Sequence, residues 1–384
     1  MSSSTHKKIV DFICQIFPGK TNIPLHEPLF VGKERQYVLD AIDSTFVSSV
    51  GKYVDKFEQM IRDYTGAKYA IATTNGTSAL HMALVLAGVE QGDLVITQPF
   101  SFVATCNAIC YIKADPYFID IDSDTLGLSY QELKNFLSEQ TFLSNQQCYH
   151  KETGKRISAC LPMHTFGMPV EIDQIVDICE KYHIKVVEDS AESLGSLYKG
   201  QQTGTFGLLG TYSFNGNKTI TCGGGGIIVT NNDELGRMAK HLTTQAKLQH
   251  KWAFKHDFVG YNYRLPNLNA ALACAQMEQL ESFIENKRET AKMYEEFFSS
   301  MSGVKFFKEN SYSKSNYWLN AILFESQDEQ QAFLEYSNSN GIMTRPGWDL
   351  LNTLPMYSNQ SENSYVNARN IHLKLVNLPS GVRK

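Results

Sequence analysis

Short apolar segments alternate with helix-periodic segments from about residue 53 to residue 240, and this alternation restricts the fold most strongly. Within the apolar segments polar residues do not alternate with apolar ones, which is typical of strands buried on both faces of a parallel sheet. Consecutive parallel strands need a crossover, usually a helix. The pattern therefore predicts an α/β domain with a mostly parallel central sheet covered by helices. The expected strands are 69–73, 94–97, 116–120, 156–161 and 184–188, and the expected helices are 53–64, 78–87, 102–112, 172–182 and one opened by a capping box at 129–132.

The N-terminal segment predicts an amphipathic helix rather than a signal peptide. Asp11 and Gln15 interrupt its apolar run, and no small-residue cleavage site follows. The apolar face of the expected helix contains Ile9, Phe12, Ile13, Ile16 and Phe17.

The C-terminal part predicts a second, smaller domain of the α+β class. A helical pattern runs for roughly 35 residues from Leu265 to about Ser300, which is longer than most globular helices. Shorter apolar runs and a polar helix follow it. We therefore expect an N-terminal arm at 1–30, a large domain at 31–260, and a long bridging helix with the small domain at 261–384.

Charge and cysteine content narrow the classes of partner. The formal net charge of −5 does not favour binding to nucleic acid or to an anionic membrane surface. No segment approaches the roughly 20 apolar residues that span a bilayer. The eight cysteines are scattered without CxxC spacing, which indicates buried free thiols rather than a metal site or disulfides and is typical of a cytoplasmic protein.

The segment 74–78 lies between an expected strand and an expected helix. Gly76 would let the backbone approach an anion, and the helix-start N–H groups with the Thr77 and Ser78 hydroxyls would suit a phosphate. The same residues are also typical of a plain helix cap. This motif alone leaves both interpretations open.

Two further motifs carry candidate site residues: one lies at the end of an expected strand, and the other lies in a turn between two apolar segments. Asp189 closes an apolar strand, where it could pair with a pyridinium N–H or simply cap the following turn. Lys218 lies among polar turn residues, so it is either a solvated loop cation or an amine that faces a cleft and can form an imine.

The order of these motifs, with Lys218 placed 29 residues after Asp189, resembles that of the fold-type I pyridoxal-phosphate enzymes. The similarity is closer to the sugar-nucleotide aminotransferases of the DegT/DnrJ/EryC1/StrS family. Seven collinear segments carry it: 75–80, 102–105, 118–122, 164–167, 188–192, 216–220 and 260–264. The segment 341–357 resembles the subgroup that serves legionaminic-acid and bacillosamine pathways.

The resemblance implies a role for each matched residue around a pyridoxal 5'-phosphate cofactor. Lys218 would be the Schiff-base lysine and proton shuttle, and Asp189 would pair with the pyridine nitrogen. Phe102 would stack on the ring, although a core position is the alternative. Glu192 would lie near the ring hydroxyl. The implied phosphate ligands are Gly76, Thr77, Ser78 and Ser213, together with Asn262 from the other subunit of a homodimer.

The resemblance also implies substrate residues and a reaction. Arg345 would bind a diphosphate and Trp348 would pack on the substrate, while surface packing is the alternative for both. His164 would contact the substrate or serve as a core histidine. Many relatives have a histidine soon after the position of Trp348, whereas this chain has 349–352 without one. The chain also ends soon after Ser380, so we expect a short last element in the small domain.

The implied reaction is amino transfer from L-glutamate to the 4-keto carbon of a 4-keto-6-deoxy sugar joined to a nucleotide. The products would be 2-oxoglutarate and a 4-amino sugar nucleotide for cell-surface glycan synthesis, with pyridoxamine 5'-phosphate as the intermediate form of the cofactor. A UDP-linked, N-acetylated sugar is expected. The alternatives are a 3-keto sugar aminotransferase, a pyridoxamine-dependent dehydratase, in which histidine replaces the lysine, and a non-enzymatic scaffold.

Overall fold

The computed structural model describes residues 3–357 and 365–384 and contains a nine-stranded central sheet. Its strands are β1 (Tyr69–Thr73), β2 (Leu94–Thr97), β3 (Asp115–Phe118), β4 (Thr141–Ser144), β5 (Gln147–His150), β6 (Arg156–Cys160), β7 (Lys185–Asp189), β10 (Leu209–Ser213) and β11 (Gly226–Thr230). The main path has the order β1–β11–β10–β7–β6–β2–β3, and β5 and β4 extend from β6 as a hairpin.

The sheet is mixed. Along the main path, β10, β7, β6, β2 and β3 pair in parallel, while β11 is antiparallel to both of its neighbours. The parallel part confirms the prediction from the apolar segments. The β4–β5 hairpin, which is antiparallel, was not predicted because three of the four residues of β4 are exposed, so the segment contains no buried apolar run.

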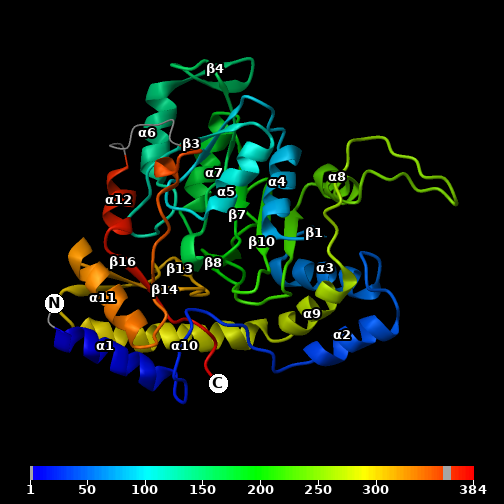
Figure 1. The fold of residues 1–384 in the computed structure, drawn as a ribbon. Helices are drawn as coiled ribbons and strands as arrows, with labels where there is room; N and C mark the ends of the chain where they lie inside the picture. Colours follow the sequence, from blue (N-terminus) through cyan, green and yellow to red (C-terminus); the bar gives the residue numbers. More distant parts are fainter. Residues whose placement is uncertain (1–2, 358–364) are drawn as a thin grey trace.

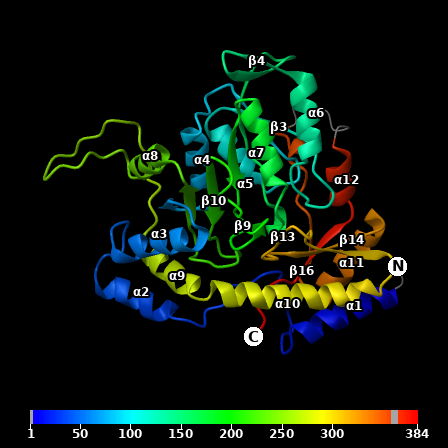
Figure 2. The same ribbon diagram turned by 180° about the vertical axis from the view of Figure 1, so that it is seen from behind.

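Helices cover both faces of this sheet (Figures 1 and 2). They are α3 (Lys52–Thr65), α4 (Gly76–Leu86), α5 (Val103–Tyr111), α6 (Tyr130–Gln140), α7 (Ile172–Lys181) and α8 (Asp233–Thr243), whereas α2 (Glu34–Asp43) lies farther from the sheet. Helices α4, α5 and α8 pack with Ile71 and Val187 on one face, whereas α3, α6 and α7 pack on the other face with residues such as Ala72 and Ile96. The predicted capping box is confirmed, because the Ser129 side chain accepts a hydrogen bond from Glu132 N at the start of α6.

The second domain is built on an antiparallel four-stranded sheet with the order β12–β14–β16–β15. Its elements are β12 (Val304–Phe307), β14 (Asn320–Phe324), β15 (Arg345–Pro346), β16 (Leu375–Leu378), α11 (Gln327–Ser339) and α12 (Val366–His372). A small sheet of β13 (Ser313–Lys314), β8 (Leu197–Tyr198) and β9 (Gln201–Gln202) joins it to the large domain. Two short 3-10 helices span Thr165–Gly167 and Leu351–Thr353.

The long helix expected after Leu265 is two helices, α9 (Asn267–Met277) and α10 (Leu280–Ser299). The break has a physical cause in packing: α9 packs on α2 and α3 of the large domain, and α10 packs on β12 of the small domain. Between them the Glu278 carboxylate accepts hydrogen bonds from Tyr37 and Lys56. Glu278 keeps helical dihedral angles, so the periodic pattern continues across the break and hides it.

The N-terminal helix α1 (Ser3–Ile16) confirms the predicted amphipathic helix. Ile9 and Ile13 are fully buried in the core of the small domain, and the Phe12 ring stacks on Phe297 with centroids 3.9 Å apart. The polar face carries the Lys7–Asp11 ion pair, which is exposed. Helix α1 is therefore part of the core of the small domain (Figure 1).

Replacing Ile13 with alanine is expected to destabilise the small domain by about 2–5 kcal/mol, because a fully buried side chain is replaced by a cavity. Differential scanning calorimetry would show this as a lower transition temperature. The neighbouring exposed residue provides the control, since Cys14→Ala should leave the transition unchanged. An Ile13→Ala transition equal to that of the wild type would contradict the docking of α1.

All eight cysteines have free thiols. Six are buried as expected, whereas Cys14 is exposed on the polar face of α1 and Cys110 is exposed near the C-terminal end of α5. Among the described residues, no helix combines the length and the apolar character needed to cross a bilayer.

Candidate active site

A cavity of about 320 Å³ lies at the carboxyl ends of the central strands. This is the edge at which parallel α/β sheets bind ligands. Eight of the residues singled out from the sequence line it: Gly76, Thr77, Phe102, Asp189, Glu192, Ser213, Lys218 and Trp348. The fold thus brings together residues that are up to 272 positions apart in the chain, from Gly76 to Trp348 (348 − 76).

Lys218 is held inside this cavity by contacts on two sides. Its side chain is only 12% exposed, and its Nζ lies 3.2 Å from Glu192 Oε1. The same Nζ lies 4.1 Å from the centroid of the Trp318 ring, a cation–π distance. Trp318 is fixed in turn because its Nε1 donates to the carbonyl oxygen of Asn217 at 2.7 Å. Lys218 is therefore a positioned amine and not a solvated loop cation.

Glu192 is a buried carboxyl that titrates near neutrality. Burial raises its pKa to about 7, and the nearby Lys218 opposes part of that rise. Its second oxygen, Oε2, accepts a hydrogen bond from the Phe166 backbone N–H at 2.9 Å, which fixes the carboxyl plane. The amine of Lys218 thus faces a carboxyl that can change its charge near pH 7.

Asp189 lies at the end of β7 and is 2% exposed. Its Oδ2 accepts from the Thr105 hydroxyl at 2.8 Å, and its Oδ1 accepts from the Ala191 backbone N–H at 3.1 Å. Burial raises the pKa of Asp189, and the Thr105 hydrogen bond is the largest influence in the opposite direction. Both contacts are neutral donors, so a cationic N–H group in the cavity would stabilise the ionised carboxylate.

The start of α4 forms a second wall of the cavity. Asn75 caps the helix because its side chain accepts from Ser78 N at 2.8 Å. The N–H groups of Gly76 and Thr77 belong to the first helical turn, where no intrahelical acceptor exists. A Cβ on Gly76 would lie 2.8 Å from the Ser213 Cβ, so glycine allows the close approach of these two segments. Backbone N–H groups and a hydroxyl thus gather at a helix N-terminus, which favours an anion.

Phe102 immediately precedes α5 and lines the cavity. It is 48% exposed, and its ring centroid lies 6.2 Å from that of Trp348. The alternative of a core phenylalanine is therefore wrong. The aromatic face instead borders open space in which a flat ring could stack.

Three predicted residues lie outside this cavity for identifiable reasons. Ser78 uses its N–H in the Asn75 cap, and its hydroxyl accepts from Thr74 at 3.3 Å. Asn262 is exposed beyond the site, and its Oδ1 accepts from Arg264 at 3.1 Å. Arg345 lies in an adjoining cavity.

His164 also lies outside, and both of its ring nitrogens are satisfied by the protein. It is fully buried, with Nε2 at 3.0 Å from Glu188 and Nδ1 accepting from Val170 N at 3.2 Å. Neither nitrogen faces the cavity. The geometry therefore gives His164 a structural role in place of the predicted substrate contact, because the strand-end position that suggested a site is occupied by internal hydrogen bonds.

The adjoining cavity measures about 490 Å³ and shares Asn217, Trp318 and Trp348 with the first. Arg345 lines it, so the two predicted substrate residues, Arg345 and Trp348, border the same space. Sequence reasoning missed Thr105 and Trp318. Thr105 ends the matched segment 102–105, in which Phe102 was the residue with an implied role, and Trp318 lies in a segment whose signal was apolar.

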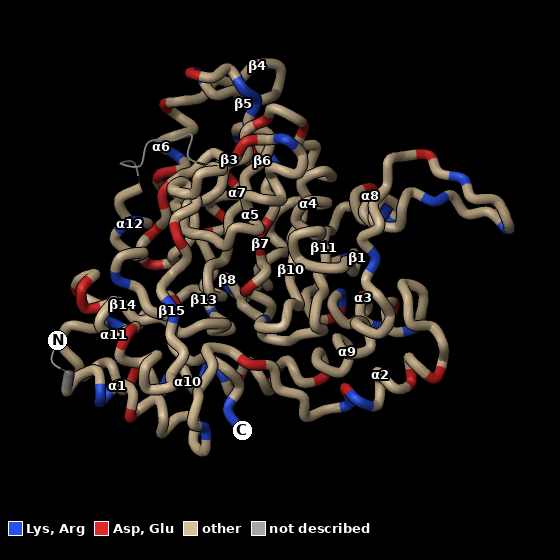
Figure 3. The backbone as a smooth tube through the Cα atoms, in the orientation of Figure 1, with Lys and Arg blue, Asp and Glu red and all other residues tan. Residues whose placement is uncertain are grey.

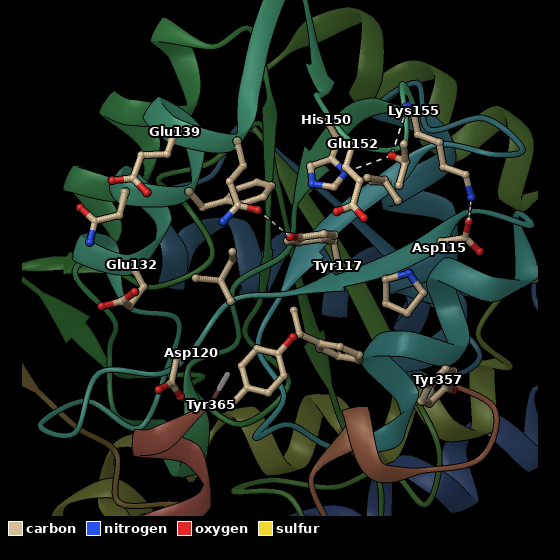
Figure 4. Close-up of a pocket in the computed structure, with 18 of the residues that line it drawn as sticks. Asp115, Tyr117, Asp120, Glu132, Glu139, His150, Glu152, Lys155, Tyr357 and Tyr365 are labelled. Atoms are coloured by element: carbon tan, nitrogen blue, oxygen red, sulfur yellow. Dashed lines mark hydrogen bonds and ion pairs between the residues drawn. The ribbon is translucent and has the colours of Figure 1, made fainter. Parts of the chain in front are cut away.

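A larger cavity of about 780 Å³ lies against the edge strand β3 (Figure 4). Its wall carries the carboxylates of Asp115, Glu132, Glu139 and Glu152, and the Lys155 amine there is already paired with Asp115. None of the predicted cofactor-binding, catalytic or substrate residues lines it. The larger cavity therefore contains none of the residues that the sequence assigns to the cofactor or the substrate.

The smaller cavity fits pyridoxal 5'-phosphate on the evidence of its own side chains. Asp189 is a buried carboxylate whose two hydrogen-bond donors are neutral, which matches a protonated pyridine nitrogen. The glycine cradle beside Ser213, at the N-terminus of α4, matches a phosphate. The enclosed amine of Lys218 matches the cofactor's aldehyde.

Comparisons with known proteins agree with this chemistry. Residues 30–383 match the DegT/DnrJ/EryC1/StrS aminotransferase family. The chain is 36% identical to the GDP-perosamine synthase of Escherichia coli O157:H7 over 358 residues, which cover 93% of both proteins. It is 35% identical to the GDP-perosamine synthase of Vibrio cholerae over 363 residues, which cover 93% of this chain and 94% of the relative.

Solved structures show the same fold. The PLP form of Spr1654 from Streptococcus pneumoniae, described as a sugar aminotransferase, has a TM-score of 0.84 and covers 94% of this chain and 93% of its own. At 21% identity this likeness concerns the fold alone. With the family match, it confirms the predicted fold class. The chain therefore belongs to the DegT/DnrJ/EryC1/StrS aminotransferase family and is a pyridoxal-phosphate-dependent sugar aminotransferase.

Proposed function

We propose that this enzyme transfers the amino group of L-glutamate to the 4-keto carbon of a 4-keto-6-deoxy sugar joined to a nucleoside diphosphate. The observation that carries the proposal is the enclosed Lys218 amine, which shares a cavity with Asp189 and adjoins a second cavity containing Arg345. A lysine at this position favours amino transfer over the dehydratase alternative, in which histidine replaces it. The positioned amine–carboxyl pair equally disfavours a non-enzymatic scaffold.

Each residue has a proposed task. Bound pyridoxal phosphate supplies carbanion stabilisation. Lys218 Nζ moves the proton between the Cα of the amino donor and the reacting cofactor carbon, and Asp189 keeps the pyridine nitrogen protonated. Phe102 orients the ring by stacking. The Gly76 and Thr77 N–H groups and the Ser213 hydroxyl bind the phosphate.

The known relatives bear most directly on which nucleotide carries the sugar. The sequence favoured a UDP-linked, N-acetylated sugar, whereas both relatives described above are GDP-perosamine synthases at 35–36% identity. We therefore propose a GDP-linked substrate and no N-acetyl requirement. The exposed guanidinium of Arg345 suits the diphosphate shared by either nucleotide.

A substrate panel tests this proposal. The purified protein, loaded with pyridoxal phosphate, is incubated with L-glutamate and 4-keto-6-deoxy sugars linked to GDP, UDP or dTDP, and 2-oxoglutarate and the amino sugar are measured. We expect turnover with the GDP-linked sugar to exceed the others. Turnover of a 3-keto sugar only, or of no sugar nucleotide, would overturn the proposal. A protein that acquires no absorbance from added pyridoxal phosphate would overturn it more broadly.

We also propose a homodimer whose two sites each receive Asn262 from the other copy. The loop between α8 and α9 extends away from the large domain (Figures 1 and 2), and its lysines lie along both arms (Figure 3). Trp252 is 79% exposed and Phe254 is 81% exposed on this loop. Exposed aromatics of this kind favour burial by a partner. Asn262 lies at the base of the loop and outside its own cavity, as a residue directed to a second copy would.

Mixing two inactive variants tests the shared site. In a hybrid dimer of Lys218→Ala and Asn262→Ala, one site receives both wild-type residues and the other receives neither. After exchange of subunits, the mixture should recover about a quarter of the wild-type activity, because half of the dimers are hybrids with one intact site. Activity that stays at the sum of the separate variants would contradict sharing, and light scattering would report the dimer independently.

The Glu192 carboxyl predicts a pH dependence with a defined sign. Its pKa is about 7, so above that pH it is ionised and accepts a hydrogen bond from Lys218 Nζ, whereas below that pH it is protonated and this ionic contact is lost. We expect kcat/KM for glutamate to fall as the pH decreases through about 7. In Glu192→Gln this decrease of kcat/KM on the acidic side of the pH profile should disappear. A decrease that persists unchanged in the variant would assign the titration to another group.

A further inference from the structure

The second cavity contains two side chains, His26 and Asn377, with buried polar atoms that have no hydrogen-bond partner among the described residues. Three atoms have no hydrogen-bond partner within the described part of the chain: the two ring nitrogens of His26 and the Oδ1 of Asn377. Both residues line this cavity, and Asn377 is 3% exposed. Buried polar atoms are almost always hydrogen-bonded in native proteins. Three unpaired polar atoms in one wall therefore indicate a ligand that supplies their partners.

His26 is held rigidly against this wall. The chain segment before it pairs with the small domain, since Ile23 N donates to Gly341 O at 2.9 Å and Met343 N donates to Ile23 O at 2.9 Å. The carbonyl oxygen of Leu25, the preceding residue, accepts from Ser380 N at 2.7 Å. Such fixed positions favour recognition, because little conformational freedom is lost when a ligand binds.

Glycine is required where this segment crosses the small domain. Gly341 has φ +77°, and a Cβ there would lie 2.6 Å from the Thr21 carbonyl oxygen. The close approach places the segment that carries His26 directly on the loop leading to Arg345. His26 and Arg345 thus reach the same cavity from two chain segments that are locked together.

The side chains of His26 and Asn377 in the wall of the second cavity suit uncharged groups of a ligand. Burial, together with the positive charges of Lys287 and Lys218, lowers the pKa of His26 well below its usual value, so the ring is neutral at pH 7. A neutral imidazole offers one donor and one acceptor, and the free Asn377 Oδ1 is an acceptor. Two acceptors and one donor match the hydroxyl groups of a sugar ring. The exposed Arg345 at the same cavity instead matches a phosphate.

We infer that His26 and Asn377 determine sugar specificity by hydrogen-bonding ring hydroxyl groups of the substrate, while Arg345 binds its diphosphate. This orientation directs the sugar towards Asn217 and Trp318, the residues that connect the second cavity to Lys218. The inference rests on the proposed function and adds to it the residues that recognise the sugar ring of the substrate.

Two substitutions test the inference by removing the polar atoms and keeping the bulk. His26→Phe and Asn377→Leu are each expected to lower kcat/KM for the 4-keto sugar nucleotide about tenfold, because a hydrogen bond to the substrate is lost. KM should rise more than kcat falls. His26→Gln, which retains a donor and an acceptor, should recover part of the loss. Inhibition by GDP alone provides a second readout, because GDP has no hexose and its inhibition constant should be the same in every variant.

A histidine remote from the cavity provides the control. His183 is exposed at the start of β7, the end opposite Asp189, so His183→Asn should leave kcat/KM unchanged. Wild-type kcat/KM in both His26→Phe and Asn377→Leu would overturn the inference, as would an equal weakening of GDP inhibition. Absence of turnover in the wild-type enzyme with every sugar nucleotide would instead overturn the proposed function, so the two failures are distinguishable.

Discussion

Lys218→Ala is expected to lower the rate of amino transfer by at least about 10³-fold, because the variant loses both the amine that binds the cofactor and the group that moves the proton. The remaining cavity would still contain Asp189 and the helix N-terminus of α4, so noncovalent cofactor binding should persist at reduced affinity. Formation of 2-oxoglutarate from glutamate measures the rate, and dialysis followed by absorbance measures retention of the cofactor.

The control for this variant is an exposed lysine. The Lys292 side chain is 76% exposed on α10, and Lys292→Ala should retain wild-type turnover. Calorimetry should show that cofactor-free Lys218→Ala still unfolds in one cooperative transition, so that a loss of turnover is not a loss of the fold. Turnover within tenfold of the wild type in Lys218→Ala would remove Lys218 from its proposed role.

Asp189→Asn is expected to have an effect of similar size on turnover, at least about 10²-fold to 10³-fold. The amide has nearly the same shape and can still accept from Thr105, but it has no charge with which to keep the pyridine nitrogen protonated. The expected signature is a lower kcat with a smaller change in cofactor affinity. Steady-state turnover with both substrates measures kcat, and stopped-flow absorbance with glutamate alone measures the rate constant of the first half-reaction.

Stability should change in the opposite direction to activity in this variant. Burial raises the pKa of Asp189 above its unfolded value, so ionisation of this group costs the cofactor-free protein stability as the pH rises through the raised pKa. Asparagine removes that cost at neutral pH. Cofactor-free Asp189→Asn should therefore unfold at the same temperature as the wild type or higher. The exposed Asp233→Asn is the matched control for activity, and a fully active Asp189→Asn would contradict the assignment.

Strand ends and helix caps could be predicted because local chemistry decides them. Asp189 ends a buried apolar run, and Ser129 is followed three positions later by glutamate, so both features are visible within a few residues. The common edge of a parallel sheet then places Asp189, Gly76 and Ser213 around one cavity. The cofactor end of the site follows from these short-range rules.

Long-range packing decides the parts that the sequence did not reveal. Trp318 contacts Lys218 across 100 positions (318 − 218), and its segment carries only an apolar signal. His26 precedes the first strand of the sheet, and its place in the second cavity depends on pairing between Ile23 and Ile342. His164 shows the converse error, because a strand-end histidine looked functional until Glu188 and Val170 accounted for both nitrogens.

The exposed aromatic loop between α8 and α9 has a consequence for how the enzyme behaves on dilution. In the proposed homodimer, in which a partner covers the exposed Trp252 and Phe254, the paired fraction follows the law of mass action. Each site then depends on a residue supplied by the other copy, so activity per milligram falls once the concentration drops below the dissociation constant. Below that concentration, a twofold change in the amount of the chain would change the activity of the proposed homodimer by more than twofold.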